Sequence, residues 1–570
     1  MLPSSASYLL WLLSAALFPF ILLAPSSHLM EWSLAQFATS PIMLPIIIDK
    51  KSTLFALTIL VISANVLTFT RTYMRHDPSL TRFTYLILLF VLSMNLLIFI
   101  PNLMALLIGW DGLGLTSFIL VIYYQNPKSL GAGMITVLSN RIGDALLLLS
   151  IAWSLNQSHW SIILMWESPL APLLTMTILL AAMTKSAQLP FSSWLPAAMA
   201  APTPVSALVH SSTLVTAGVF LLIRFSPFLM KTPWFSPTLL VISSTTMLMA
   251  SHSALMECDM KKIIALSTLS QLGVMMFSLA LHMPNLTLFH LLTHAMFKAL
   301  LFLCAGSIIL MSHHAQDLRQ MGTTWISMPT ITSTLATANL ALCGTPFLSG
   351  FYSKDMIIES SLISPTNPLI LLTLTLATYL TTAYSIRLLM ASTLSPTQSH
   401  PSSSASDTSP PLLFPTVSLS SLAIIFGAAL NWILVAPLKH PELPPLWKSL
   451  PLILLTLSLT TASLLHAKSS TPLPNIPSIH FNATSMWHLT PPSHQNLLQL
   501  PLFLSDSLYK SNDAGWLETL GPQGSFTSLS TPGSNITSLQ SLTFPNFILF
   551  SFLSISILFI LFSPDSLHKA

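Results

Sequence analysis

Residues 185–196 read Lys-Ser-Ala-Gln-Leu-Pro-Phe-Ser-Ser-Trp-Leu-Pro and follow an apolar run. A proline removes a backbone donor and clashes with the preceding helical turn, so Pro190 predicts a break in a helix, with Lys185 just before it. Residues 343–355 read Cys-Gly-Thr-Pro-Phe-Leu-Ser-Gly-Phe-Tyr-Ser-Lys-Asp and repeat the pattern with Pro346 and Lys354. Proline-kinked helices are common in membrane proteins, but a lysine at each break favours inverted repeats around an ion path.

The rest of the chain has the composition of a membrane protein. Its 570 residues include 21 Lys and Arg and 17 Asp and Glu, so 7% are charged, whereas soluble domains have about 25%. Hydrophobic residues make up 52%, and the mean hydropathy is +0.73. This composition excludes a cytosolic globular enzyme and a disordered chain, and the net charge of +4 is too small and too dispersed for a nucleic-acid-binding surface.

Roughly fifteen apolar runs are long enough to cross a membrane, for which a helix needs about 20 residues. The runs are continuous and rich in leucine, whereas the strands of a membrane barrel alternate in short segments. The predicted fold class is therefore an all-α polytopic membrane protein in which two of the helices are broken. The first run, residues 8–24, has no Lys or Arg before Lys50 and is interpreted as a permanent helix rather than a signal peptide.

The sequence patterns argue against a bound cofactor or metal. Cys258, Cys304 and Cys343 lie far apart without a Cys-x-x-Cys pair, so we expect small buried residues. Residues 109–114 (Gly-Trp-Asp-Gly-Leu-Gly) are not flanked by a βαβ unit, which argues against nucleotide binding. His290 and His294 have the i, i+4 spacing of zinc ligands, but no Glu follows His290 and no third ligand is evident. We expect neither a cofactor nor a metal on this chain.

Ionisable side chains inside apolar spans identify the candidate site, because inserting each one costs roughly 2.5–3.5 kcal/mol and such residues tend to be functional. These residues fall between positions 111 and 387, whereas after residue 400 the charged residues lie in loops, at span ends or in an amphipathic segment. The candidates are Asp111, Arg141, Asp144, Lys185, His210, Arg224, His290, His294, Lys298, Lys354, Asp355 and Arg387.

Several of these residues also have structural explanations. Arg141 and Asp144 are spaced i, i+3, and a structural ion pair explains that spacing as well as a functional pair does. Arg224 lies at a span end, where snorkelling to the interface is the better explanation. Asp111 and Lys185 lie well inside apolar runs, where a charged side chain does not reach the interface easily.

The best-aligned candidates lie in one helix. His290, His294 and Lys298 follow each other at i, i+4 and i+8, which places them along one helical face. A row of titratable groups is suited to relaying protons. Burial lowers the proton affinity of a lysine and a nearby carboxylate restores it, so a lysine that gains and loses such a partner binds and releases a proton. This behaviour is that of a pump element.

Seven motifs at these positions resemble the antiporter-like subunits of respiratory complex I, which also resemble Mrp-type cation/proton antiporters. The resemblance runs from about residue 50 to residue 390 and is highly specific. The motifs that carry it are Gly109–Gly114, Asn140–Asp144, Lys185–Gln188, Pro202–Thr213, Ser267–Gly273, His294–Ala299 and Gly350–Asp355.

The resemblance implies a role for each matching residue. Asp111 stands where the family has a glutamate that pairs with the lysine of the first broken helix, here Lys185, and its arm is one methylene shorter. Arg141 and Asp144 match an ion pair that tunes the first pair. The remaining matches are the polar axis, His210, His290, His294 and Lys298, and then Lys354 with Asp355 at the second broken helix.

As a member of this family, the chain is expected to translocate protons at the distal end of the complex I membrane arm, as a subunit of NADH:ubiquinone reductase. Lys185 would pass its proton through His290, His294 and Lys298 toward Lys354 and Asp355. The resemblance places NADH, FMN, the iron–sulfur clusters and ubiquinone on other subunits, with no redox centre here. Its partners would be other membrane-arm subunits, especially the neighbouring antiporter-like ones, together with lipids and protons but no nucleic acid. Its location would be the mitochondrial inner membrane.

Two other functions remain open at this point. The first is an Mrp-type antiporter subunit that exchanges Na⁺ for H⁺. The second is a structural membrane scaffold whose charges form static ion pairs.

The expected organisation has five parts: transmembrane helices in 1–82, the antiporter-like core with two inverted repeats in 83–392, and peripheral helices and loops in 393–494. A lateral amphipathic helix in 495–543 and an anchor helix in 544–570 follow. The first span is expected to match the family's second, so that one further helix of the family is missing. The lateral helix is expected to be interrupted by Gly521, Pro522, Gly524, Pro532 and Gly533.

Overall fold

The computed structural model describes residues 2–23, 27–37, 40–157, 159–161, 169–396, 407, 409–435, 443–467, 477–493, 497–541 and 543–562. Helices account for 81% of the structure, which confirms the predicted helical class. The chain separates into two compact units, Met1–Thr490 and Pro491–Ala570. The finer division into five parts stays a prediction.

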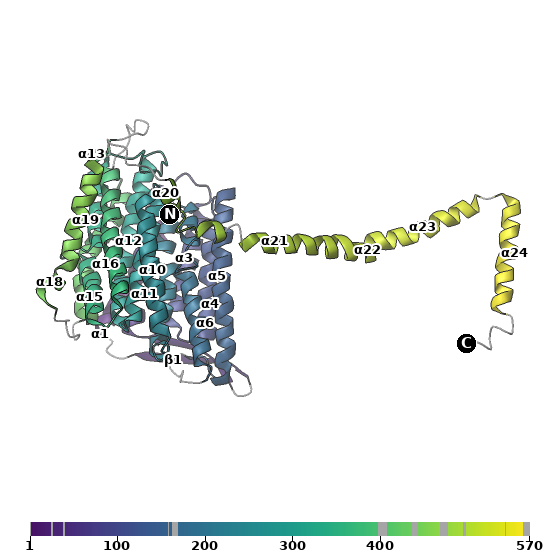
Figure 1. The fold of residues 1–570 in the computed structure, drawn as a ribbon, viewed down its shortest axis with the longest axis horizontal. Helices are drawn as coiled ribbons and strands as arrows, with labels where there is room; N and C mark the ends of the chain where they lie inside the picture. Colours follow the sequence, from purple (N-terminus) through teal and green to yellow (C-terminus); the bar gives the residue numbers. More distant parts are fainter. Residues whose placement is uncertain are drawn as a thin grey trace. The chain divides into compact units, whose positions relative to one another are not determined.

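The first unit is a bundle of helices that stand side by side (Figure 1). In chain order its elements are α1 (Leu2–Leu23), β1 (His28–Phe37), β2 (Ser40–Ile48), α2 (Lys50–Tyr73), α3 (Leu80–Phe99), α4 (Leu103–Val121), α5 (Pro127–Ser154), η1 (Leu155–Gln157), α6 (Ala171–Lys185), α7 (Trp194–Ala197), η3 (Ala198–Ala200), α8 (Thr203–Val205), η4 (Ser206–Thr213), α9 (Leu214–Leu229), α10 (Phe235–Met256), α11 (Met260–Ala280), α12 (Pro284–Met311), α13 (Thr324–Ser327), α14 (Pro329–Cys343), α15 (Ser349–Ile363), α16 (Pro368–Leu389), η5 (Met390–Leu394), α17 (Pro410–Leu430), η6 (Asn431–Val435), α18 (Pro445–Lys448), α19 (Leu450–Ala467) and α20 (Pro477–Thr484).

The expected count of about fifteen spans is not confirmed. Within the described ranges, twelve helices are long and apolar enough to cross a membrane, and Ala171–Lys185 and Leu450–Leu464 are shorter apolar helices. The difference arises partly at the two broken spans, because α6, α14 and α15 have 15 residues each. A helix of that length is shorter than the bilayer core is thick.

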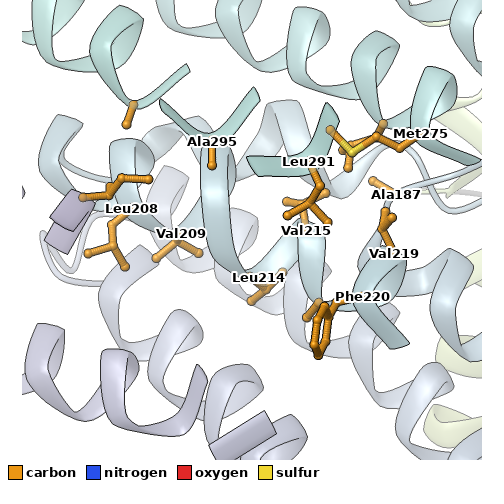
Figure 2. Packing of buried hydrophobic residues seen from close by; sticks show 14 of the residues in the cluster. Ala187, Leu208, Val209, Leu214, Val215, Val219, Phe220, Met275, Leu291 and Ala295 are labelled. Carbon is orange, nitrogen blue, oxygen red and sulfur yellow. The ribbon is translucent and has the colours of Figure 1, made fainter. Parts of the chain in front are cut away.

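The centre of the bundle is formed by α2, α8–η4–α9, α11 and α12, whose side chains are almost all buried. Figure 2 shows apolar residues of η4, α9, α11 and α12 packed together, with Ala187 of the first break among them. The polar residues of these helices therefore lie inside protein and not against lipid, which is where charged groups in a membrane bundle are found.

The first break separates α6 from α7, and Pro190 lies in the connecting segment 186–193. A backbone carbonyl group at the end of α6 finds a hydrogen-bond donor nearby, because the Trp194 indole N–H donates to the Thr184 carbonyl oxygen at 3.0 Å. Gln188 ties the segment to α10, since its Oε1 accepts from the Thr246 hydroxyl at 2.7 Å. The unwound backbone is thus packed in protein and hydrogen-bonded, as membrane burial requires.

The second break separates α14 from α15, and Pro346 lies in the segment 344–348. Gly344 ends α14 in the left-handed region, with φ at 83°. The N–H groups of Gly344 and Thr345 donate to the carbonyl oxygens of Ala341 and Leu340, each at 3.2 Å. This arrangement is a glycine C-cap, which stops α14 and lets α15 begin in a new direction.

A hairpin precedes α2 and was not predicted from the sequence. Strands β1 and β2 pair antiparallel from His28 with Ile48 to Phe37 with Ser40, with a register shift between Ser33 and Ala35. The hairpin is joined to the bundle by the Asn102 side-chain amide, which donates to the Met43 carbonyl oxygen at 3.0 Å.

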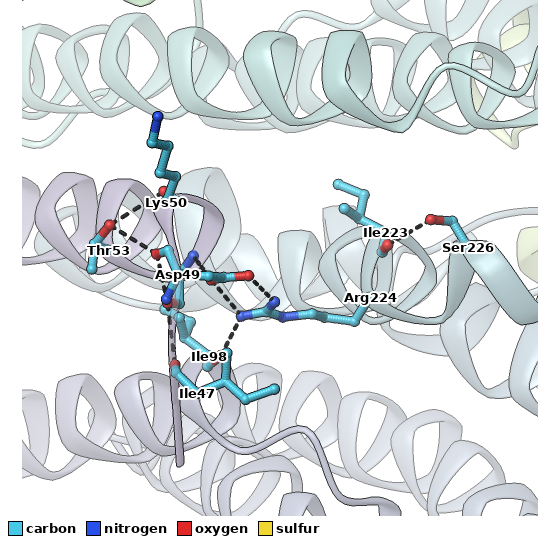
Figure 3. A network of polar contacts seen from close by, with 9 residues as sticks. Ile47, Asp49, Lys50, Thr53, Ile98, Ile223, Arg224 and Ser226 are labelled. Atoms are coloured by element: carbon cyan, nitrogen blue, oxygen red, sulfur yellow. Dashed lines mark hydrogen bonds and ion pairs between the residues drawn. The ribbon is translucent and has the colours of Figure 1, made fainter. Parts of the chain in front are cut away.

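Asp49 lies between the hairpin and α2 and pairs with Arg224 near the end of α9 (Figure 3). The two guanidinium nitrogens lie 2.5 and 3.0 Å from the carboxylate oxygens, and one also donates to the Ile98 carbonyl oxygen at 3.4 Å. Asp49 caps α2 as well, accepting from the Ser52 N–H at 2.8 Å. Arg224 therefore joins α9 to Asp49 at the start of α2, as a structural clamp, and its place at the membrane interface stays a prediction.

The second unit consists of α21 (Leu497–Leu508), the π-helical η8 (Tyr509–Trp516), α22 (Leu517–Leu520), α23 (Pro522–Gln540) and α24 (Phe544–Leu561). Between 497 and 540 the helical run is interrupted only at Gly521, and Pro532 lies inside α23 without ending it. No described side chain of this unit is buried, including the apolar ones of α24. Residues 495 and 496 of the expected lateral helix, and 563–570 of the expected anchor, lie outside the described residues.

Candidate functional site

Lys185 is the last residue of α6 and is fully buried. Its ammonium donates to the backbone oxygen of Trp110 on α4 at 2.6 Å, and its Nζ lies 3.9 Å from the centre of the Trp110 ring. Among the residues that the structure describes, no carboxylate lies within 4.0 Å of this ammonium. An ammonium over an aromatic face is stabilised by cation–π attraction. Lys185 is therefore held by neutral groups of one residue.

Asp111, which was expected beside Lys185, lies in a charged cluster on α4 and α5 that also contains the predicted Arg141–Asp144 pair. Asp144 Oδ1 accepts from the Trp110 indole N–H at 2.8 Å, and Asp144 Oδ2 lies 3.3 Å from Arg141. Asp111 Oδ2 lies 3.9 Å from the same guanidinium, while Asp111 Oδ1 is buried without a hydrogen-bond partner. Arg141 thus joins the two carboxylates, and Asp111, with its short arm, pairs with Arg141 instead of Lys185.

His210 lies in η4, a π-helical stretch soon after the first break. Its side chain is buried, its ring centre lies 6.2 Å from that of Trp194, and neither ring nitrogen has a hydrogen-bond partner among the described residues. The hydroxyls of Ser212 and Thr213 donate to the Leu208 carbonyl oxygen at 3.1 and 2.7 Å. Such bonds replace part of the backbone ladder where a helix widens, and π-helical turns are frequent at functional sites.

The face of α12 that was predicted to relay protons is buried in the structure. His290, His294 and Lys298 are each at most 1% exposed. His290 Nδ1 lies 2.9 Å from the Ser353 hydroxyl of α15, and its Nε2 lies 3.2 Å from Gln271 Oε1 of α11.

The other two members of this face differ in their contacts. The ring of His294 lies 6.3 Å from that of His290, centre to centre, and its two nitrogens have no hydrogen-bond partner in the described part of the chain. The Lys298 ammonium donates to the Ser267 hydroxyl of α11. Lys298 is thus bound, like Lys185, to a neutral oxygen.

Lys354 lies in α15, just after the second break, and is 4% exposed. Its ammonium donates to the Thr381 hydroxyl of α16 at 3.0 Å. Asp355 is the next residue along the chain, yet the two side chains form no ion pair within 4.0 Å in the described residues. Both line a small pocket together with Cys343 and with Leu455 of α19.

Helix α16 contributes residues that the sequence did not single out. The Tyr384 hydroxyl is buried and lies 3.2 Å from the Ser270 hydroxyl of α11, and it also contacts the side chains of Gln271 and Ser267. It therefore touches the partner of His290 and the partner of Lys298. The run Thr381-Thr382-Ala383-Tyr384-Ser385 inside an apolar span is the sequence signal that marks this face.

Two sequence candidates lie apart from this constellation. Arg224 is engaged with Asp49, as described above. Arg387 donates to the backbone oxygens of Leu255 and Glu257, so it closes the end of α10. Among the described residues, no group of three or more His, Cys, Asp and Glu side chains is placed to hold a metal ion.

Three family models match the chain. The model for NADH-ubiquinone oxidoreductase (complex I) chain 5 N-terminus matches residues 32–84. The model for the transmembrane part of NADH:quinone oxidoreductase and Mrp antiporters matches residues 101–381, and the model for NADH dehydrogenase subunit 5 C-terminus matches residues 384–562.

Curated relatives are similar over nearly the whole chain. NADH-ubiquinone oxidoreductase chain 5 of Lumbricus terrestris is 52% identical over 545 residues, which is 93% of each chain. The proteins of the same name from Anopheles gambiae and Locusta migratoria are 46% and 44% identical, covering 87% and 93% of this chain and 87% and 94% of the relatives.

Among solved structures, the Mrp complex from Dietzia sp. DQ12-45-1b has a TM-score of 0.73 at 22% identity. The similarity covers 99% of this chain, which spans 64% of that chain. At this identity the likeness concerns the fold alone.

Proposed function

The chain belongs to the family of NADH–ubiquinone oxidoreductase chain 5, and from this membership we propose that its buried lysines and histidines form the route along which protons cross the membrane. The chain is a proton-translocating, multi-pass subunit of the complex I membrane arm. The high identity to chain 5 relatives favours this function over an Mrp-type Na⁺/H⁺ antiporter subunit.

The observation that carries the proposed route is the set of partners around the three buried lysines of the candidate site; a fourth buried lysine, Lys261, donates to the Ala201 carbonyl oxygen at 3.2 Å and is not among the matched positions. Lys185, Lys298 and Lys354 donate to a carbonyl oxygen and to two hydroxyls, and none forms an ion pair in the described residues. Burying a charge without a counter-charge is strongly unfavourable, and a static scaffold avoids it. Lysines in this position are suited to gaining and losing protons, which argues against the scaffold function.

The hydrogen bonds support a particular point at which the proton passes from α12 to the second broken helix, α15. Both side-chain bonds from α12 to α15, those of His290 and Thr293, end on the Ser353 hydroxyl, which precedes Lys354. We propose that the proton reaches the second broken helix at His290, so that Lys298 and His294 come before His290 and the order along α12 is the reverse of the one expected from the sequence. His210 and His294, whose ring nitrogens have no partner among the described residues, are the intermediate acceptors.

The charged cluster on α4 and α5 indicates where another subunit lies. The side chains of Arg141 and Asp111 are 49% and 40% exposed in the middle of apolar helices. Exposed apolar residues such as Ile108 and Leu138 surround them on the same helices. Because charges facing lipid at this depth are strongly unfavourable, we propose that a neighbouring antiporter-like subunit covers this face.

The remaining assignments follow from the family. Partnership with other antiporter-like subunits is characteristic of such chains. We propose that NADH, FMN, the iron–sulfur clusters and ubiquinone are bound by other subunits of the assembly, and that the assembly lies in the mitochondrial inner membrane. Quinone reduction elsewhere in the complex would then drive the charge changes along this route.

Replacement of Lys298 by Met in the assembled complex tests the route. The variant has an unbranched side chain that is one atom shorter and carries no charge, and we expect fewer protons translocated per NADH oxidised in liposomes. Lys262→Met is the matched control, because that lysine is 39% exposed and pairs with Asp259 at 3.2 Å. Full pumping by an assembled Lys298→Met complex would contradict the route.

A further inference from the structure

Trp110 uses three of its groups to join residues that do not touch each other. It is fully buried in α4. Its carbonyl oxygen accepts from Lys185 at 2.6 Å, its ring face lies 3.9 Å from the same ammonium, and its indole N–H donates to Asp144 at 2.8 Å. One rigid side chain therefore connects the lysine of the first broken helix to the carboxylate cluster on α5.

We propose that Trp110 is a positioning residue for proton transfer, which holds the Lys185 ammonium in a site without a carboxylate and couples that site to Asp144. This inference rests on the proposed function. According to this proposal, Lys185 is stable without a carboxylate partner because it contacts one aromatic residue, Trp110.

The alternative position for the ammonium lies next to Trp110 in the chain. Asp111 Oδ1 is buried and has no hydrogen-bond partner, and Asp111 Oδ2 is 3.9 Å from Arg141. An ammonium that leaves the Trp110 ring thus has an open carboxylate oxygen on the adjacent residue. Cation–π attraction is strongest where water is excluded, so the ring makes the unpaired position competitive with an ion pair.

The indole N–H gives this site a connection to the half-exposed face of the bundle. Asp144 shares its carboxylate between Trp110 and Arg141, and Arg141 also reaches Asp111. In the described residues, the charged groups that act on Lys185 are these three and belong to α4 and α5. A chain of contacts thus links Arg141 to Lys185 through Asp144 and Trp110.

The experiment compares two substitutions in the assembled complex. Trp110→Phe keeps an aromatic face and the backbone carbonyl but removes the N–H donor, whereas Trp110→Leu keeps only the carbonyl. Proton uptake per NADH oxidised is measured in liposomes across a range of pH. Trp153 of α5, which is half-buried, serves as the matched control with the same two substitutions.

We expect the coupled proton-transfer rate to fall about tenfold for Trp110→Leu and less for Trp110→Phe, with the Trp153 variants unchanged. The alkaline limit of pumping moves to lower pH in Trp110→Leu, because the ring no longer favours the charged lysine. A merely structural role lowers the amount of complex without moving the pH profile.

Lys185→Met separates this proposal from the function on which it rests. If Lys185→Met stops pumping while both Trp110 variants keep the wild-type rate and pH profile, the role of Trp110 is overturned and the proton route stands. If Lys185→Met pumps normally, the route itself fails. Should Trp110→Leu not assemble, the rate and profile of Trp110→Phe decide, and failure of both to assemble overturns the proposal in favour of a structural role.

Discussion

His290 Nδ1 lies 2.9 Å from the hydroxyl oxygen of Ser353, and this contact joins the central helix α12 to the second broken helix α15. Thr293 reaches the same hydroxyl at 3.2 Å. Ser353 directly precedes Lys354, so the bond brings a titratable ring to the segment that carries the last lysine of the proposed route. The hydroxyl can accept a proton from one side while it donates its own to the other.

Ser353→Ala removes this hydroxyl and little volume. We expect proton translocation per NADH to fall several-fold while the complex still assembles, because the His290 ring loses the group that orients it. The comparison is Ser360→Ala in the same helix, where the hydroxyl bonds to the Ile357 carbonyl oxygen at 2.9 Å and to no other helix in the described part of the chain. Equal pumping by the two variants would remove Ser353 from the route.

Tyr384→Phe tests the contribution of α16. The variant keeps the ring and loses the hydroxyl that contacts Ser270, Gln271 and Ser267. We expect slower pumping, because the side chains that hold His290 and Lys298 lose a shared partner. Tyr379→Phe on the same helix is the control, since its hydroxyl bonds to Thr461 at 2.8 Å, away from the route. A fall of the same size in both variants would indicate a general effect on α16 packing.

Asp111→Glu and Asp111→Asn separate carboxylate charge from arm length. Glu keeps the charge and lengthens the arm by one methylene, whereas Asn leaves Arg141 with Asp144 as its one carboxylate in this cluster. We expect the Glu variant to pump within about twofold of wild type and the Asn variant to lose about tenfold, the effect of roughly 1.4 kcal/mol in a barrier. The number of protons translocated per electron is measured for both variants. Normal pumping by Asp111→Asn would contradict a role for the Asp111 charge.

The Asp49–Arg224 clamp is expected to contribute to stability and not to pumping. Burial raises the pKa of Asp49, but the hydrogen bond and charge of Arg224, together with the Ser52 bonds, outweigh burial and place the pKa below its ordinary 3.8. A carboxyl with a lowered pKa stabilises the fold fully above 3.8, and this contribution is lost as the pH falls through the folded-state pKa.

Asp49→Asn should therefore lower the free energy of unfolding by about 2 kcal/mol. The loss should be equal at pH 6 and pH 8, as measured by retention of the chain in the complex after heating. Asp506→Asn is the control, because the Asp506–Lys510 pair is exposed and such pairs contribute little. A loss that changes between pH 6 and pH 8 would mean that another group is responsible.

Most of the fold could be predicted from the sequence because the bilayer imposes simple rules. Long apolar runs become helices, and prolines beside Lys185 and Lys354 mark where helices stop. The hairpin His28–Ile48 could not be recognised in this way. Its second strand is an apolar run with Pro41 and Pro45, and what makes it a strand is pairing with β1, which no local pattern records.

The charged residues of the candidate site could be picked out for the same reason, since ionisable residues stand out in apolar spans. The residues that contact these charged side chains could not be predicted from the sequence. Trp110, Ser267 and Tyr384 belong to types that are common in membrane helices, and only their contacts with Lys185, Lys298 and the α11 side chains give them a role. The pairing of Asp111 with Arg141 could not be predicted either, because it depends on the distances between side-chain atoms in the folded chain.

The neutral partners of Lys185, Lys298 and Lys354 have a consequence for how the proton occupancies of these lysines influence one another. A carboxylate beside each ammonium would cancel its field locally, whereas a carbonyl or hydroxyl oxygen leaves most of that field in place. In a low-dielectric interior such fields extend over several residues. A proton that arrives at one lysine therefore disfavours a proton at the next. Occupancy is expected to alternate along the bundle, so that the state of one site is communicated by repulsion with little need for the helices to move.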